Sequence, residues 1–161
     1  MPLSLQHQID LTYSSLPDQP PAHTPTQITM VKKLIELYLV TFQNYDYTAT
    51  RNLVHKDYKQ HNPLVGDGAE SIIEFGELMK AAAAEQAKEA GKKVFEKPEL
   101  RYKHLLVDGE FIVVHVHAVR WEGDLGMNIF DLFRYRDGLF VEHWDAIAEV
   151  RAECRNLNGV F

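Results

Sequence analysis

The sequence predicts a single α+β domain in which helices precede a run of antiparallel strands. In the first half of the chain apolar residues recur at helical spacing, whereas residues 100–147 are rich in β-branched and aromatic side chains. Two pairs, Asp108-Gly109 and Asp137-Gly138, interrupt this second region, and Asp-Gly supplies the positive φ angles that a two-residue hairpin turn requires. Helices followed by strands, rather than alternating with them, are typical of the α+β class.

Length, charge and cysteine content limit the classes of protein to which this chain could belong. A length of 161 residues suits one domain with a sizeable core, and a net charge of −6 argues against nucleic acid or an anionic membrane as a partner. The single cysteine, Cys154, excludes an intrachain disulfide. No apolar run approaches the roughly 18 residues of a transmembrane helix, and the N-terminus lacks the basic start and apolar middle of a signal peptide. We therefore expect a cytoplasmic protein.

The two ends of the chain differ in composition from its middle. Residues 1–27 contain five prolines among Ser, Thr and Gln, which predicts an extended or disordered arm. Alternatively, the arm could wrap around a partner subunit, because it contains apolar residues to bury there. The domain itself is expected to span residues 28–150, and residues 151–161 to form a polar C-terminal tail.

Three helices and a short extended segment are predicted before the sheet. Thr29 is a plausible N-cap for a first helix whose apolar stripe runs over residues 31–42. A second, short helix is predicted at residues 47–55, and an extended segment at residues 58–63 that proline stops. The third helix is predicted at residues 69–90, where an alanine-rich second half has little to bury.

Four strands should follow as an antiparallel meander over residues 100–107, 110–121, 127–135 and 139–147. The last two strands are apolar on both faces, so the sheet is expected to be covered on each side. A carboxylate at Asp131 in such a strand is costly unless something uses it.

The register of the last hairpin can be predicted from its turn. Counting back from the Asp-Gly pair places Asp131 opposite Trp144, with Phe133 on the same face. His143 and Asp145 would then point to the other face, unless a β-bulge intervenes.

Two histidines, His115 and His117, lie two residues apart on a predicted strand and so project to one face. A three-residue connection centred on Asp124 puts His117 opposite Asp131, whereas a two- or four-residue connection turns them to opposite faces. We favour the first. A histidine facing an aspartate in an apolar cavity is a candidate acid/base pair, because burial and mutual attraction shift both pKa values.

This pair has two alternative interpretations. It could be a structural contact that only holds the strands together, since such contacts also shift pKa values. The His-x-His pattern also permits a metal site with His61, Glu142 or His143 as further ligands. No fixed spacing to a third ligand supports that site, so no metal is predicted.

His61 and Trp144 are further candidates for the pocket. His61 lies where a short strand ends at Pro63, from which its side chain could reach a pocket mouth with Tyr58 nearby. Alternatively, His61 and its neighbour satisfy the turn through side-chain to backbone hydrogen bonds. Trp144 could wall the cavity beside Asp131 or simply pack in the core.

Several motifs together resemble the SnoaL-like polyketide cyclase family of the NTF2-like superfamily. They are YKQHNP followed by a Gly-Asp-Gly loop, the HVH strand, and FDLFRYRDGLFVEHWD, and the resemblance covers about residues 31–147. It implies an NTF2-like cone, in which a curved antiparallel sheet wraps three helices around a deep apolar pocket. It also implies a homodimer formed through the sheet.

The resemblance assigns roles to individual residues. Asp131 matches the acid/base of an intramolecular aldol closure, and His117 the histidine that assists it. Residues expected to contact substrate are His61, Tyr58, His115, Trp144 and Phe133. The implied function is a cofactor-independent enzyme for aldol-type cyclisation, isomerisation or related proton transfer on a small, apolar carbonyl compound. The alternative is a non-catalytic, dimeric protein that binds a small ligand, because this fold serves both purposes.

Overall fold

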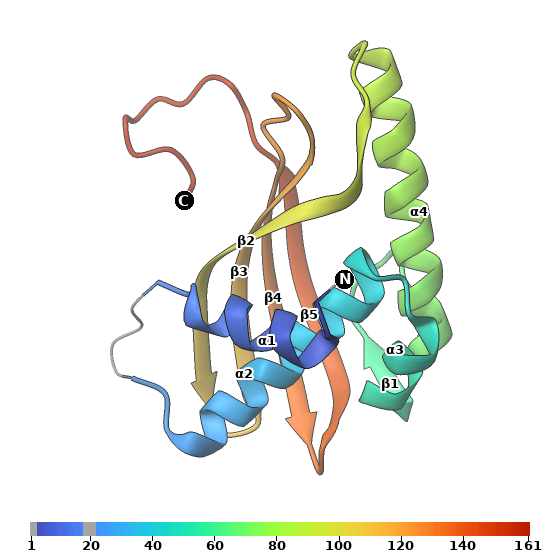
Figure 1. Ribbon diagram of the computed structural model, residues 1–161, viewed down its shortest axis with the longest axis vertical. Helices are drawn as coiled ribbons and strands as arrows, with labels where there is room; N and C mark the ends of the chain where they lie inside the picture. The colour runs from blue at the N-terminus through green and yellow to red at the C-terminus, as the bar shows by residue number, and fades with distance from the viewer. Residues whose placement is uncertain (1–2, 18–21) are drawn as a thin grey trace.

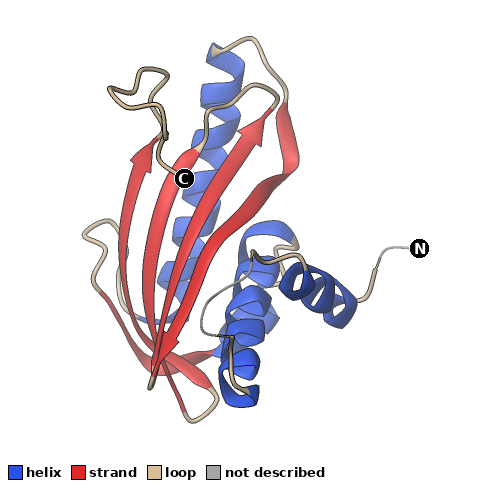
Figure 2. Ribbon diagram, turned by 90° about the vertical axis from the view of Figure 1, so that its left-hand side faces the viewer, coloured by secondary structure: helices blue, strands red, loops and turns tan. Residues whose placement is uncertain are grey.

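The computed structural model describes residues 3–17 and 22–161, which fold as helices on the concave side of a curved sheet (Figures 1 and 2). The helices are α1 (Leu5–Ser14), α2 (Pro25–Tyr38), α3 (Tyr47–Leu53) and α4 (Gly68–Glu89), and a π-helical turn, η1 (Leu39–Gln43), continues α2. The strands are β1 (Val54–Gln60), β2 (Val94–Asp108), β3 (Phe111–Trp121), β4 (Met127–Arg136) and β5 (Leu139–Glu149). The α+β class and the predicted curved sheet are confirmed. In the described part of the chain no helix is long and apolar enough to cross a membrane.

The N-terminal arm is not extended, and this prediction is wrong for residues 5–14. Those residues form α1, with Ser4 accepting a hydrogen bond from the backbone N–H of His7 at its start. Leu5, Ile9 and Tyr13 are four residues apart, so they share one face of the helix and pack on the core beside α2. Residues 1–2 and 18–21 of the predicted arm lie outside the described residues.

Helix α2 begins earlier than its apolar stripe indicates. Thr24 is its N-cap, in a capping box with Gln27, and Pro25 occupies the first turn. The predicted cap, Thr29, instead donates its hydroxyl to the carbonyl of Pro25 inside the helix. The other predicted helices are confirmed with shifted ends, as α3 and α4.

The meander of β2 to β5 is confirmed. Asp137-Gly138 forms the turn between β4 and β5, but Gly109 and Glu110 form the turn between β2 and β3, because Asp108 still pairs with Phe111 in the ladder. At the second turn Asp137 and Gly138 have φ angles of 51° and 86°. The sheet has a further strand, because β1 pairs parallel with β5 at its edge in the order β1-β5-β4-β3-β2. This parallel pairing brings residues 60–62 beside the second half of β5.

A β-bulge in β5 overturns the predicted register of the last hairpin. Tyr135 pairs with Phe140, but the preceding residue of β4, Arg134, pairs with Glu142, so Val141 is an extra residue in the ladder. Asp131 therefore lies opposite Asp145 rather than Trp144. Because side chains alternate along a strand, the bulge turns His143 and Asp145 to the concave face and Trp144 to the convex one.

The predicted pairing of His117 with Asp131 is also wrong. In the ladder between β3 and β4, His117 lies opposite Asn128, and Asp131 lies opposite Val114. His117 and His115 thus project from the convex face, away from Asp131. There the His117 ring contacts the carbonyl of Leu125, with Nε2 at 2.8 Å from the oxygen.

Candidate active site

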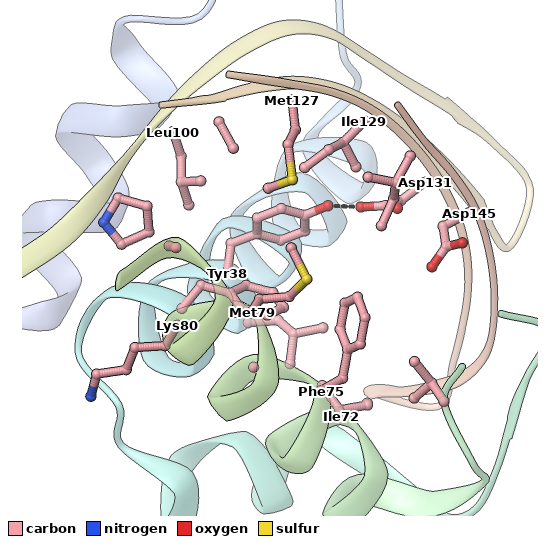
Figure 3. Close-up of a pocket in the computed structure, with 18 of the residues that line it drawn as sticks. Tyr38, Ile72, Phe75, Met79, Lys80, Leu100, Met127, Ile129, Asp131 and Asp145 are labelled. Atoms are coloured by element: carbon pink, nitrogen blue, oxygen red, sulfur yellow. Dashed lines mark hydrogen bonds between the residues drawn. The ribbon is translucent and has the colours of Figure 1, made fainter. Parts of the chain in front are cut away.

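A cavity of about 140 Å³ lies between the concave face of the sheet and helices α2 and α4 (Figure 3). Its walls are mainly apolar. The sheet contributes Leu100, Met127 and Ile129, and the helices contribute Phe75 and Met79. The pocket predicted within the cone is therefore present, and it offers a ligand a dry, apolar environment.

Asp131 projects from β4 into the wall of this cavity and is only 7% exposed. The hydroxyl of Tyr38, at the end of α2, donates a hydrogen bond to its Oδ2 atom (Figure 3). Burial raises the pKa of the Asp131 carboxyl, the contact with His143 acts in the opposite direction, and the charge of Asp145 adds to the increase. A carboxyl with these neighbours takes up a proton more readily than one in water.

His143 lies beside Asp131 on the adjacent strand. Its Nε2 atom is 3.3 Å from Oδ1 of Asp131, which is an ion-pair distance. The direction of this contact is not that of a hydrogen bond, so among the described residues the buried Nε2 atom has no hydrogen-bond partner. The other ring nitrogen, Nδ1, is 3.1 Å from Oε1 of Gln60 at the end of β1. The ring of Phe133 stacks on the imidazole with centroids 4.1 Å apart.

A second carboxylate, Asp145, lines the cavity next to this pair. Asn62 donates its amide N–H groups to both oxygens, with Nδ2 at 2.9 Å and 2.7 Å from them. The amide oxygen of Asn62 accepts from the backbone N–H of Leu64 at 2.8 Å. Since that backbone group can only donate, the Asn62 amide is fixed with its N–H groups toward Asp145.

Among the described residues, one group is arranged so that it could bind a metal ion: Asp131, His143 and Asp145. Their potential ligand atoms lie within 4.8 Å of one another, and two carboxylates with an imidazole suit a divalent cation. Tyr38 and Asn62 already donate hydrogen bonds to these two carboxylates.

A buried ion network closes the cavity at the end of β3. Arg120, which is 6% exposed, bonds to Asp124 of the β3–β4 loop, to Glu149 at the end of β5 and to the amide oxygen of Gln86 on α4. Burial tends to lower the pKa of this guanidinium, but the two carboxylates outweigh burial and raise it. The network ties the second half of α4 to the sheet.

The structure brings only some of the predicted site residues together. Asp131, Tyr58 and Phe133 line the cavity. Four others lie on the convex side of the sheet or at its edge and do not line it, which corrects their assignment: His61, His115, His117 and Trp144. His61 stacks on the ring of Trp144 with centroids 4.5 Å apart, because the bulge turned that ring outward.

Sequence reasoning missed the residues that replace them. His143 and Asp145 belong to the EHWD end of the last motif, but they reach Asp131 only through the bulge. Tyr38 belongs to an apolar helical stripe that predicts core packing, and only the tertiary structure places its hydroxyl on Asp131. Gln60 and Asn62 flank His61, so the segment was identified while its functional side chains were not.

The curved sheet and its helices define an NTF2-like fold, with a carboxylate and an imidazole on the wall of an apolar cavity. Residues 35–143 match the model of the SnoaL-like domain. The chain belongs to this SnoaL-like family, as its motifs predict.

Three solved structures illustrate the similarity. A proposed polyketide cyclase from Bacillus cereus ATCC 10987 has a TM-score of 0.59 and 12% identity, over 83% of this chain and 87% of that one. IdmH, a proposed polyketide cyclase from Streptomyces antibioticus, has a TM-score of 0.54 and 18% identity, over 78% and 92% of the chains. A proposed ketosteroid isomerase from Kribbella flavida DSM 17836 has a TM-score of 0.50 and 18% identity, over 78% and 82%. At these identities the similarity shows a shared fold. No curated protein matches this chain.

Proposed function

We propose that this protein is a cofactor-independent enzyme that moves a proton on a small, apolar carbonyl compound, in an aldol-type cyclisation, an isomerisation or a related reaction. The observation that carries the proposal is the position of Asp131, a buried carboxylate on the wall of an apolar cavity with Tyr38 and His143 in contact. The names of the similar structures, proposed polyketide cyclases and a proposed ketosteroid isomerase, support chemistry of this kind.

In this proposal Asp131 is the base. It takes a proton from the carbon next to the carbonyl group, and the raised pKa of its carboxyl makes it a better acceptor for that proton. The hydroxyl of Tyr38 is the nearest donor, and it can turn its hydrogen bond from Asp131 to the oxygen of the enolate. The same carboxyl then returns the proton to the product.

His143 takes the role that the sequence analysis gave to His117. Its ring lines the cavity, but its Nε2 atom is buried and lies 3.3 Å from Oδ1 of Asp131, so this nitrogen acts on the substrate through the carboxylate. An imidazolium at this position would offset the cost of burying the carboxylate and hold it toward the cavity.

The experiment that tests this function needs no knowledge of the product. Small apolar ketones and 1,3-dicarbonyl compounds are incubated with the protein in D₂O, and exchange at the carbon next to the carbonyl is followed by proton NMR. The wild type should accelerate exchange for part of the panel. Asp131→Asn should reduce that rate by about 10² or more, because general base catalysis typically contributes this much.

Binding measured in parallel separates the two functions. Asp131→Asn has nearly the same shape, so the affinity for a bound ketone should change by no more than a few fold. If ketones bind to the wild type and no exchange occurs, the catalytic proposal fails and the alternative, a non-catalytic protein that binds small ligands, becomes the better account.

A further inference from the structure

We propose that Gln60 is a positioning residue that sets the protonation of the His143–Asp131 pair. Its amide oxygen holds a proton on Nδ1 of His143, so that the pair needs a second proton, either on Nε2 of His143 or on the carboxyl of Asp131. The functional consequence of this inference rests on the proposed function, but the protonation state itself does not.

The orientation of the Gln60 amide follows from its backbone neighbours. Its Oε1 atom lies 2.9 Å from the backbone nitrogen of His61 and 3.1 Å from that of Asn62. A backbone N–H can only donate, so the atom that meets both groups must be the amide oxygen. The NH₂ group of Gln60 is then directed toward the hydroxyl of Tyr58, at 3.5 Å.

The same oxygen determines which nitrogen of His143 carries hydrogen. Nδ1 is 3.1 Å from this Oε1, and two acceptors at this distance would repel each other. Nδ1 must therefore be the donor. In a neutral imidazole with hydrogen on Nδ1, the Nε2 atom has only a lone pair.

An Nε2 atom without hydrogen would be a partly negative atom close to a carboxylate oxygen. Nε2 is 3.3 Å from Oδ1 of Asp131, and although this contact lacks the direction of a hydrogen bond, a buried nitrogen lone pair and an anionic oxygen repel each other at this distance unless one of the two groups gains a proton. The pair is then either an imidazolium beside a carboxylate or a neutral imidazole beside a carboxylic acid. Both states have no net charge, which suits a buried site.

The extra proton would matter when an enolate forms. With the imidazolium in place, Asp131 takes the proton of the substrate, and the positive charge left on His143 balances the negative enolate in the apolar cavity. Without the oxygen of Gln60, the imidazole could carry its only proton on Nε2 and pair with an ionised Asp131. The enolate would then form in this cavity with no balancing charge, at a higher energy.

The other groups around His143 agree with a charged pair. Tyr58 and Gln60 face it from β1, Asp131 from β4, Asp145 from its own strand and Tyr38 from α2. The two carboxylates attract a positive charge on the ring. Two cationic side chains, Lys80 of α4 and Arg120 of β3, line the same cavity, and Arg120 is paired with Asp124 and Glu149.

The test is nitrogen-15 NMR of the histidine rings in the whole protein near neutral pH. The signals of His143 are assigned as those missing from His143→Gln. In the wild type Nδ1 should be protonated. Gln60→Glu keeps an acceptor oxygen for all three donors, so Nδ1 should remain protonated. Gln60→Met removes the acceptor, so the proton should move to Nε2.

A wild-type spectrum with Nδ1 unprotonated would overturn the proposal. So would a Gln60→Met spectrum identical to the wild type. Gln60→Met also loses the hydrogen bonds from the backbone N–H groups of His61 and Asn62, and this loss could prevent folding. In that case the wild type and Gln60→Glu still test the proposal, because Nδ1 of His143 must be protonated in both.

Exchange rates separate this inference from the proposed function. If both hold, Gln60→Met should slow exchange by at least about tenfold with ligand affinity unchanged within twofold, since a wrong histidine tautomer can cost much more. If Nδ1 is protonated but no variant exchanges hydrogen on the ketones, the role of Gln60 in protonation stands and the proposed function is refuted. If the wild type exchanges hydrogen on the ketones but its Nδ1 is unprotonated, the proposed function stands and the role of Gln60 is refuted.

Discussion

At the level of single residues, two tyrosines in the core differ in the hydrogen bonding of their hydroxyl groups. The hydroxyl of Tyr38 donates to Asp131, whereas the buried hydroxyl of Tyr102 has no hydrogen-bond partner among the described residues. Their rings are neighbours, with centroids 5.9 Å apart. The pair therefore offers a matched comparison in nearly the same surroundings.

Tyr38→Phe should lower the free energy of unfolding by about 2 kcal/mol, because it leaves an oxygen of a buried carboxyl without its donor. Tyr102→Phe should leave the stability unchanged or raise it slightly, since it removes a polar group that makes no hydrogen bond. Urea unfolding of both variants measures the difference. Equal losses in the two variants would mean that the bond from Tyr38 contributes nothing specific.

At the level of elements, the second half of α4 buries few apolar side chains against the sheet. The sequence of this half is alanine-rich and predicts little burial, and the structure agrees, with Ala83 and Ala87 as its buried residues. The guanidinium of Arg120 supplies a further link through Gln86. One buried cation therefore helps to hold the second half of α4 against the sheet.

Arg120→Met should cost about 3 kcal/mol of stability, because it leaves the buried Asp124 without its partner. It should also speed amide hydrogen exchange in the second half of α4. Arg101→Met is the control: Arg101 pairs with Glu99 at the surface, and such pairs contribute at most about 1 kcal/mol. Similar losses for both variants would contradict a structural role for the buried network.

The fold was predictable because its signals are local. Helical periodicity and the two Asp-Gly turns identify α2 to α4 and the meander, and they depend on neighbours in sequence. The parallel pairing of β1 with β5 joins segments about 80 residues apart and leaves no local pattern. Helix α1 was missed because the prolines on either side of it in the sequence obscured the spacing of Leu5, Ile9 and Tyr13.

The site was predicted less well, for a related reason. Asp131 was identified because a carboxylate in an apolar strand is costly and local sequence reveals it. The predicted neighbour Trp144 was wrong because one bulged residue reverses the face of every later side chain in β5, and no residue type marks Val141 as that position. The predicted partner His117 was wrong because the sequence does not fix the length of the β3–β4 connection, and the ladder pairs His117 with Asn128. The motif residues were therefore correct while their orientation was not.

At the scale of the whole molecule, the convex face of the sheet carries exposed aromatic side chains. Phe130 is 44% exposed and stacks on His115, with centroids 3.9 Å apart. We propose that a second copy of the chain covers this face, as the family resemblance implies, because large apolar groups on a sheet face are typical of interfaces.

Phe130→Asp should convert such a dimer to a monomer, since it replaces an exposed aromatic ring of the proposed interface with a charge. Sedimentation velocity at several concentrations measures this change. Leu78→Asp is the control, because Leu78 is similarly exposed on α4, away from the convex face. A wild type that sediments as a monomer, or a dimer that both variants leave intact, would rule out this interface.

The bulge at Val141 also has a genetic consequence. Because the ladder skips this residue, an in-frame loss of its codon would straighten β5 and leave His143 and Asp145 facing Asp131. Loss of the codon for Trp144 would instead turn Asp145 to the convex face and remove it from the cavity. Two single-codon deletions, three codons apart, would thus have different effects: loss of Val141 would keep the site residues together, and loss of Trp144 would separate them.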